Sequence, residues 1–439
     1  MPDSQPQPPP SWSSSSGTPG GSPDPAALLL CGARLTDGRT VDVRLGHGRI
    51  EAVGTAGSLA AVPVRGGARV DLGGYLLLPA PAEPHAHADT ALTADADGPV
   101  SYAPEDVQRR ATEAVLLQLG HGATALRAHV RVGDVQGLRA LTAVLRARRS
   151  LRGLAELTAV AMPRVLTGAA GADGLAILRD ALKMGASAVG GCPDLDPDPT
   201  GYVEAVLEVA SEHGCPVDLH TDAADPARLA RLAAVVGGLR PGVTLGPCAG
   251  LDRLPAETAG RTADQLAAAG VTVVCLPQGG CGAVEHRGTT PVRLLRAAGV
   301  RVAAGSGALR DVSNPVGRGD PLEAAYLLAS RHGLRPEDAY DAVSTHARAA
   351  LGLPEVRVEA GFPADLLAVR GDRLAGALSL AYSRIVIHGG HVVARTSAVR
   401  EYCNSATTSA TATELGLPRQ GKRGDRGERG ERGERGELP

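Results

Sequence analysis

His85 and His87 are the residues of this sequence whose type and spacing point most directly to chemistry. They lie two positions apart near the end of the stretch Leu76–Asp89, LLLPAPAEPHAHAD, after an apolar run and a Pro-rich break. Residues i and i+2 of a strand face the same side, so both imidazoles can reach one ion. Because imidazole is a common metal ligand, the pair predicts half of a metal site. The alternative interpretation is a pair of solvent-exposed loop histidines.

Apolar runs of strand length recur after this pair, and Ala-, Leu- and Arg-rich segments of helical period separate them. The runs cover residues 123–130, 156–163, 186–192, 216–222, 243–248, 271–277 and 301–307. Together with the strand of the His-x-His pair they make eight strands that alternate with helices. This rhythm predicts a (β/α)8 (TIM) barrel.

The C-terminal ends of the strands form the active site of such a barrel. Besides His85 and His87, the residues His129, His220 and Asp222 lie at predicted strand ends. We therefore expect these side chains to gather around one site.

The chain divides into five predicted parts. The barrel covers residues 76–355, and short β-rich segments at 26–75 and 356–396 are predicted to pair into a small β-sandwich. Residues 1–25 and 397–439 have low complexity and few apolar side chains, which predicts disordered tails. Repeated Gly, Glu and Arg in the second tail favour a solvated segment over a collagen-like helix.

Composition excludes several classes of partner. The formal net charge is −2 and no basic cluster precedes the C-terminal tail, so nucleic acid and anionic membranes are not expected partners. No apolar segment reaches membrane-spanning length and no signal-peptide pattern is present. The 7 cysteines are scattered without CxxC spacing, which indicates a reduced, cytoplasmic protein.

Several motifs together resemble the amidohydrolase superfamily, and specifically its cytosine deaminase-like branch, over residues 28–396. The segment EPHAHADTALTA resembles that branch's Glu-Pro-His-x-His-x-Asp strand, and GATALRAHV resembles its Arg-x-His-Val strand. The segments ALKMGASAVGGCPD, VDLHTDAADP, GSGALRDVSNPVGRGDPLEAA and EAGFPADLLAV resemble its later motifs in the same order.

The resemblance implies one divalent metal ion, zinc or iron, held by His85, His87, His220 and an aspartate of the eighth strand. Such an ion activates a water to attack an amide-like or amidine carbon of a small cyclic compound. A Glu after the fifth-strand His moves protons, and a sixth-strand His orients the water. The resemblance also implies a small-molecule partner and leaves a homo-oligomer open.

Four family positions carry other residues in this chain. Ala223 stands for the proton-moving Glu, Pro247 for the sixth-strand His, Gly307 for the metal-binding Asp, and Arg164 for a third-strand substrate Gln. The register at Gly307 is fixed by the family residues that follow it, Arg310, Asp311, Asn314 and Pro315. We therefore expect a hydrolase of non-peptide carbon–nitrogen bonds by lineage, with its reaction slow or absent, that is, a pseudoenzyme.

A second interpretation is an active metal-dependent hydrolase with rewired proton transfer and an anionic substrate. Asp222 would then be catalytic, and Arg164, Asp194 and Asp89 would bind the substrate. His129, retained at a family position, would support the metal histidines from outside.

Cys248, next to the lost histidine, is a further candidate, although such a cysteine is more often a small buried apolar residue. A third interpretation is a non-catalytic binding or assembly protein in which the tails carry the function.

Overall fold

The computed structural model of the chain describes most of the sequence between the two predicted tails. The described residues are 27–59, 67–96, 98–133, 136–169, 171–237, 242–280, 289–380 and 383–398. The segments predicted to be disordered, 1–25 and 397–439, lie outside them except for residues 397 and 398.

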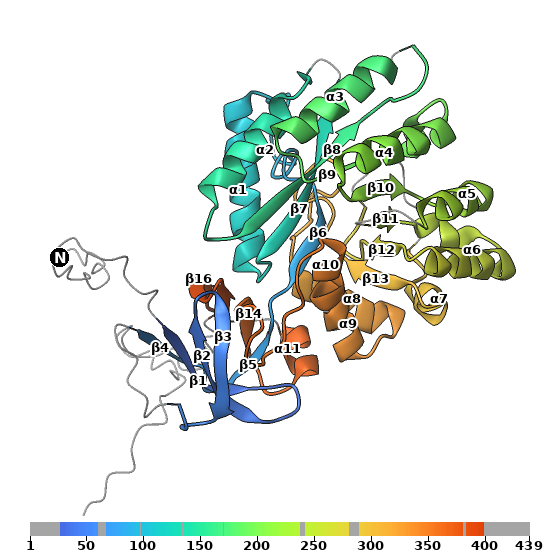
Figure 1. The fold of residues 1–439 in the computed structure, drawn as a ribbon. Helices are drawn as coiled ribbons and strands as arrows, with labels where there is room; N and C mark the ends of the chain where they lie inside the picture. The colour runs from blue at the N-terminus through green and yellow to red at the C-terminus, as the bar shows by residue number, and fades with distance from the viewer. Residues whose placement is uncertain are drawn as a thin grey trace, which may run out of the picture. The chain divides into compact units, whose positions relative to one another are not determined.

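Eight parallel strands form the first sheet, and the strands follow one another in chain order (Figure 1). They are β6 (Ala82–Ala86), β7 (Ala125–Val132), β8 (Glu156–Pro163), β9 (Ala188–Gly191), β10 (Val217–Thr221), β11 (Val243–Pro247), β12 (Thr272–Cys275) and β13 (Arg301–Ala304). A parallel bridge between Ala86 and Gly307 brings the two ends of the sheet together. The predicted (β/α)8 barrel is confirmed.

Helices alternate with these strands. They are α1 (Pro104–Gly120), α2 (Arg139–Ser150), α3 (Gly171–Met184), α4 (Pro199–His213), α5 (Pro226–Val236), α6 (Ala256–Ala268), α7 (Val292–Ala297) and α8 (Pro321–His332), followed by α9 (Pro336–Val343), α10 (Thr345–Ala350) and α11 (Leu374–Leu380). Three of them begin at Asp-Pro pairs, where the carboxylates of Asp198, Asp225 and Asp320 accept hydrogen bonds from backbone N–H groups of the first turn.

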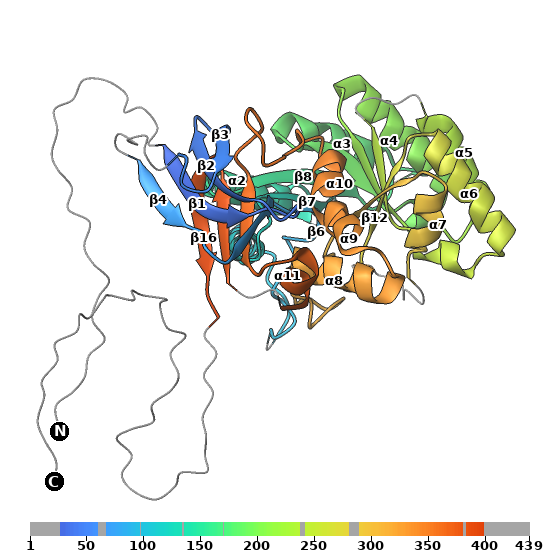
Figure 2. The same ribbon diagram turned by 90° about the horizontal axis from the view of Figure 1, so that it is seen from below.

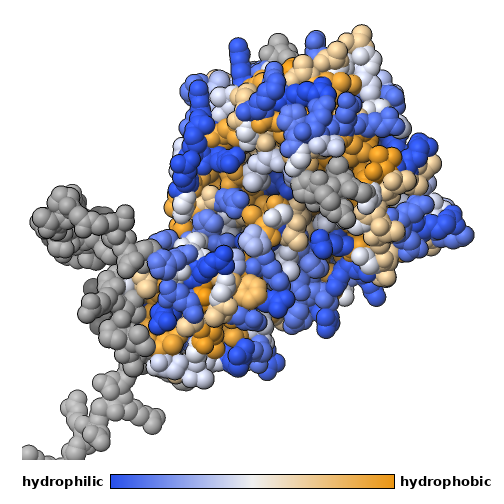
Figure 3. Space-filling view, in the orientation of Figure 1, coloured by the Kyte–Doolittle hydropathy of each residue, from blue (hydrophilic) through white to orange (hydrophobic). Residues whose placement is uncertain are grey.

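Hydrophilic residues dominate the outer faces of the helices on the side seen in Figure 3, with hydrophobic residues between them. This is the pattern of amphipathic helices that pack on a sheet. Among the described residues, no helix has the length and apolar character needed to span a bilayer.

A second sheet, here called the terminal sheet, combines strands from before and after the barrel (Figure 2). Its strands are β1 (Leu28–Arg34), β2 (Thr40–Gly46), β3 (Arg49–Thr55), β4 (Ala68–Asp71), β5 (Tyr75–Pro79), β14 (Leu366–Arg370), β15 (Arg384–His388) and β16 (His391–Thr396). β5 pairs with β14 in antiparallel register, so the two flanking segments do meet in one sheet, as the sequence predicts.

The strand that carries the His-x-His pair differs from the expectation. The apolar run at Leu76–Leu78 belongs to β5 of the terminal sheet, and the histidine strand β6 starts only at Ala82. Leu77 packs in the core of the terminal sheet, whereas its neighbours Leu76 and Leu78 pack in the core of the barrel. Because both faces of β5 are buried, its residues are apolar without alternation. The barrel therefore begins near residue 82 rather than at 76.

Asp365 connects the barrel to the terminal sheet. Its carboxylate accepts hydrogen bonds from Nη2 of Arg348 in α10 at 3.0 Å and from Nδ1 of His388 in β15 at 2.8 Å. Arg348 is 2% exposed and Asp365 8% exposed, so the charges of this pair are largely shielded from water.

We expect Asp365→Ala to lower the free energy of unfolding by about 3–5 kcal/mol, because it leaves the guanidinium of Arg348 buried without its carboxylate. Urea denaturation measures this change. The control is Asp37→Ala, which removes an exposed ion pair with Arg39 and is expected to cost far less, because water screens this pair. Equal losses in the two variants would contradict the structural role of Asp365.

Candidate metal centre

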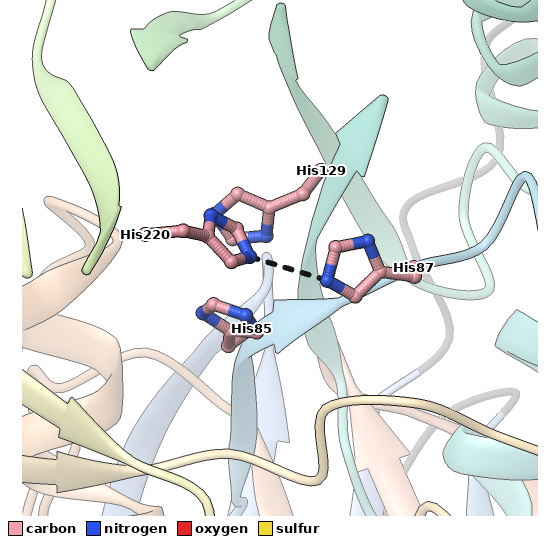
Figure 4. Close-up of side chains that lie close together, drawn as sticks. All are labelled: His85, His87, His129 and His220. Atoms are coloured by element: carbon pink, nitrogen blue, oxygen red, sulfur yellow. Dashed lines mark hydrogen bonds between the residues drawn. The ribbon is translucent and has the colours of Figure 1, made fainter. Parts of the chain in front are cut away.

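Four histidines from three barrel strands converge at one point, here called the histidine centre (Figure 4). His85 is the last residue but one of β6 and His87 directly follows the strand, while His129 lies in β7 and His220 in β10. One ring nitrogen from each residue lies within 4.8 Å of those of the others. The structure thus brings together the three histidines expected to bind a metal and adds His129, to which the sequence assigned a supporting role.

Alternation along the strands places these rings inside the barrel. In β7, Leu126, Ala128 and Val130 belong to the main apolar core, and His129 lies between them in the sequence and faces the opposite way. In β10, Leu219 joins the same core and His220 faces inward. The strand period therefore separates the helix layer from a polar barrel interior.

Burial keeps three rings of the centre, those of His85, His87 and His220, neutral. Loss of water contact, followed by the repulsion of neighbouring imidazoles, lowers the pKa of His87 to about 3. The same two causes lower the pKa of His85 and His220 well below the usual value. At pH 7 each of these rings therefore has a lone pair that no proton blocks.

The geometry of the centre fits a divalent transition metal. Zinc–nitrogen bonds of 2.0–2.1 Å at tetrahedral angles place two ligand nitrogens about 3.3 Å apart. Nε2 of His220 lies 3.2 Å from Nε2 of His87. Both ring nitrogens of His129 and Nδ1 of His220 are buried and have no hydrogen-bond partner within the described part of the chain. A donor set of imidazole nitrogens suits zinc and iron.

Asp218 lies directly beneath the centre, two residues before His220 on the inward face of β10. Its Oδ1 is 3.2 Å from Nε2 of His129, and its Oδ2 accepts a hydrogen bond from Nη1 of Arg127 at 2.9 Å. Burial acts to raise the pKa of Asp218, but His129 and Arg127 together hold it below the usual value. None of the sequence motifs marks this residue, although its i−2 position relative to His220 indicates an inward side chain.

Glu83 occupies the matching place beneath His85 in β6. Its carboxylate accepts hydrogen bonds from the backbone N–H groups of His85 and Ser306, both at 2.9 Å. Burial raises the pKa of Glu83 to about 7. This carboxyl group ties the histidine strand to the chain after β13, next to the point where Gly307 N donates to the carbonyl of His85 at 3.0 Å.

The positions that the sequence resemblance assigns to proton transfer hold no acid or base. Ala223 is 1% exposed and Pro247 ends the buried strand β11. Gly307 adopts a φ of 71°, in the left-handed region that favours glycine. Within the described residues, the group that could hold a metal contains imidazoles and no carboxylate.

The other predicted site residues lie outside this group. Asp194 follows β9 in η2 (Pro193–Leu195), where its Oδ1 pairs with Nη1 of Arg228 at 2.7 Å. Arg164 is exposed just beyond the end of β8. Asp89 is 4% exposed, and burial raises its pKa. Cys248 is fully buried, and burial raises the pKa of its thiol far above the usual value.

Asp222 follows the end of β10, and its carboxylate pairs with Arg253 of η3 (Ala249–Arg253). We expect Asp222→Asn to leave the metal content unchanged, because this carboxylate binds a guanidinium rather than the histidine centre. Stability should fall by about 1 kcal/mol or less, since Arg253 is partly exposed. Elemental analysis of this variant, side by side with His220→Ala, measures the metal content. Loss of metal in both variants would indicate that Asp222 also binds the ion.

Comparison with known proteins agrees with this architecture. The profile of the amidohydrolase family matches residues 102–394. Pterin deaminase of Rhizobium rhizogenes is 28% identical over 323 residues, which cover 68% of this chain and 72% of that protein. The crystal structure of N-isopropylammelide isopropylaminohydrolase from Burkholderia multivorans has a TM-score of 0.75 at 28% identity, covering 85% of this chain and 100% of that chain.

The fold is shared with 5-methylcytosine deaminase from Klebsiella pneumoniae, at a TM-score of 0.74 and 24% identity over 86% of this chain and 99% of that chain. The resemblance to the deaminase-like branch of the amidohydrolase superfamily is confirmed. Since the family profile covers more than half of the sequence, the chain belongs to the amidohydrolase family.

Proposed function

We propose that this protein binds one divalent metal ion, zinc or iron, at the histidine centre and binds a small cyclic amide or amidine near it. We propose further that hydrolysis of the carbon–nitrogen bond is slow or absent. The observation that supports this most is the composition of the centre, in which four imidazoles meet without a carboxylate in the described part of the chain.

The residues of the chain explain both halves of the proposal. His85, His87 and His220 present neutral rings to the ion, which, when bound, lowers the pKa of a coordinated water. The methyl group of Ala223 cannot accept a proton from that water or deliver one to a leaving nitrogen. Positioned proton transfer is worth about 10²–10⁴-fold in rate, so its loss alone would slow the reaction by that factor.

The relatives support the class of ligand. Pterin deaminase and N-isopropylammelide isopropylaminohydrolase are both named for removing an amine from a nitrogen heterocycle. A heterocycle with an exocyclic amine is therefore the first ligand class to test. The cytoplasmic location and the oligomeric state stay predictions from the sequence.

Amine release from pterin, cytosine and N-isopropylammelide tests the catalytic half, with the zinc-loaded protein beside the variant His85→Ala/His87→Ala. We expect equal and negligible release from both proteins, while heterocycles raise the melting temperature of the wild type only. Metal-dependent turnover in the wild type would contradict the proposed loss of activity. It would favour the interpretation of the protein as an active hydrolase with rewired proton transfer. Asp89, a buried carboxyl with a raised pKa, would then be the first proton acceptor to replace.

A further inference from the structure

We infer that His129 is the fourth ligand of the bound ion, through Nδ1, and that Asp218 is the positioning residue that holds the ring in this orientation. His129 would thus take the coordination place that the eighth-strand aspartate fills in the family and that Gly307 cannot fill here. The inference rests on the proposed metal binding and names the ligand set of that site.

The position of the His129 ring is the first observation that supports its role as a ligand. Its centroid lies 4.3 Å from that of His85, 4.7 Å from that of His220 and 5.6 Å from that of His87. The side chain is fully buried, and besides the other three rings it has Asp218 as a neighbour, with Oδ1 at 3.2 Å from Nε2. A ring so placed faces the same point as the three expected ligands.

The second observation concerns the tautomer of His129, that is, which of its ring nitrogens can bind the ion. Nε2 of His129 lies 3.2 Å from Oδ1 of Asp218, and an ionised carboxylate only accepts hydrogen bonds. A hydrogen on Nε2 would face this carboxylate, and the lone pair of the ring would then be at Nδ1. Nδ1 is buried and has no hydrogen-bond partner among the residues that the structure describes; Nε2 lies close to the carboxylate of Asp218 but also lacks hydrogen-bond geometry there. An ion at the centre would satisfy this nitrogen.

Arg127 fixes the carboxylate behind the ring. Its Nη1 donates to Oδ2 of Asp218 at 2.9 Å and lies 3.4 Å from Oγ1 of Thr244. Because the guanidinium offsets the charge of Asp218, the pair orients His129 rather than neutralising the ion. Carboxylates that hydrogen-bond a ligating histidine act in this way in known metal sites, where their removal weakens metal binding about 10–100-fold.

The ligand set has a direct chemical consequence. Four imidazole nitrogens complete the tetrahedral sphere of zinc, which is the closed arrangement of structural sites, whereas catalytic zinc keeps one position for water. Water reaches the ion only if one imidazole leaves. The lost proton acceptor at Ala223 and the closed sphere would then suppress hydrolysis independently.

X-ray absorption at the zinc edge of the loaded wild-type protein counts the ligands directly. We expect four imidazoles per zinc; three imidazoles with a water oxygen would overturn the assignment of His129. A wild-type protein that takes up no zinc would instead overturn the proposed metal binding itself. His129→Ala should show three imidazoles and at least one oxygen.

Zinc affinity, measured by competition with a chromophoric chelator, tests the role of Asp218. We expect Asp218→Asn to weaken binding about 10–100-fold. The matched control is Asp365→Asn, which also removes a buried carboxylate bound to an arginine and a histidine, but outside the centre. We expect wild-type affinity in this control. Equal zinc affinities in the two variants would overturn the positioning role of Asp218. If Asp218→Asn fails to fold, the zinc-edge spectrum of the wild type still tests the assignment of His129 as a ligand.

Discussion

His85→Ala/His87→Ala is expected to reduce the metal content from about one equivalent per chain to almost none, because it removes half of the imidazoles that a tetrahedral ion needs. The variant should also lose the stabilisation that a bound ion gives the folded state. That stabilisation is about 4 kcal/mol when free metal exceeds its dissociation constant by about 1,000-fold. Elemental analysis and thermal unfolding, each with and without a chelator, measure the two effects.

The control for this experiment replaces two exposed histidines outside the centre, His213 and His391. It should keep the metal content and the chelator-sensitive melting temperature of the wild type. Wild-type protein that is insensitive to chelator and free of metal would contradict the metal centre, and the histidines would then be polar residues of the barrel interior.

The metal-free protein is expected to lose stability as the pH falls below about 6.5. The folded pKa of His87 is about 3, and those of His85 and His220 are also lowered, so these rings stay neutral in the fold while the unfolded chain takes up protons near 6.5. Their stabilisation is complete above the unfolded pKa and is lost as the pH falls towards the folded values. Each extra proton on the unfolded chain changes the free energy of unfolding by about 1.4 kcal/mol per pH unit.

Glu83 acts in the opposite direction. Its folded pKa of about 7 exceeds the usual 4.5, so the folded state holds one more proton between these values, and the stabilisation is lost as the pH rises through 7. Between pH 4.5 and 6.5 the unfolded chain binds three more protons at the histidines and one fewer at Glu83. The net difference of two protons makes the free energy of unfolding fall by about 3 kcal/mol for each pH unit of acidification. Urea denaturation across this range measures the slope. In His85→Ala/His87→Ala only His220 opposes Glu83, so the slope should nearly vanish; an unchanged slope would contradict the assignment.

The sequence predicts the barrel well because its strands are apolar and bounded by glycine, proline or polar residues. The apolar run at 156–163 coincides with β8, and the run at 216–222 contains β10. The assignment of Leu76–Leu78 to the barrel is wrong because periodicity records burial but not the partner. A strand buried on both faces has the same pattern in either sheet.

The site residues also fall into two groups: those whose orientation follows from local strand alternation, and those whose role depends on contacts across the barrel. Alternation correctly turns His220 inward, but β10 ends at Thr221, so the rule no longer applies to Asp222, which follows the loop to Arg253. The role of His129 depends on distances across the barrel that no local pattern contains. Asp218 has a recognisable inward position, but its contact with a residue 89 positions earlier in the sequence exists only after the barrel closes.

The pairing of β5 with β14 has a consequence for the order of folding during synthesis. β5 precedes the whole barrel, yet its antiparallel partner β14 begins at Leu366. The hydrogen bonds of β5 on that edge stay unmade until nearly the whole barrel has left the ribosome, and at about 5–20 residues per second this takes tens of seconds. An unpaired apolar edge of this kind promotes association with other chains. The nascent protein is therefore expected to depend on chaperones most strongly before its C-terminal strands emerge.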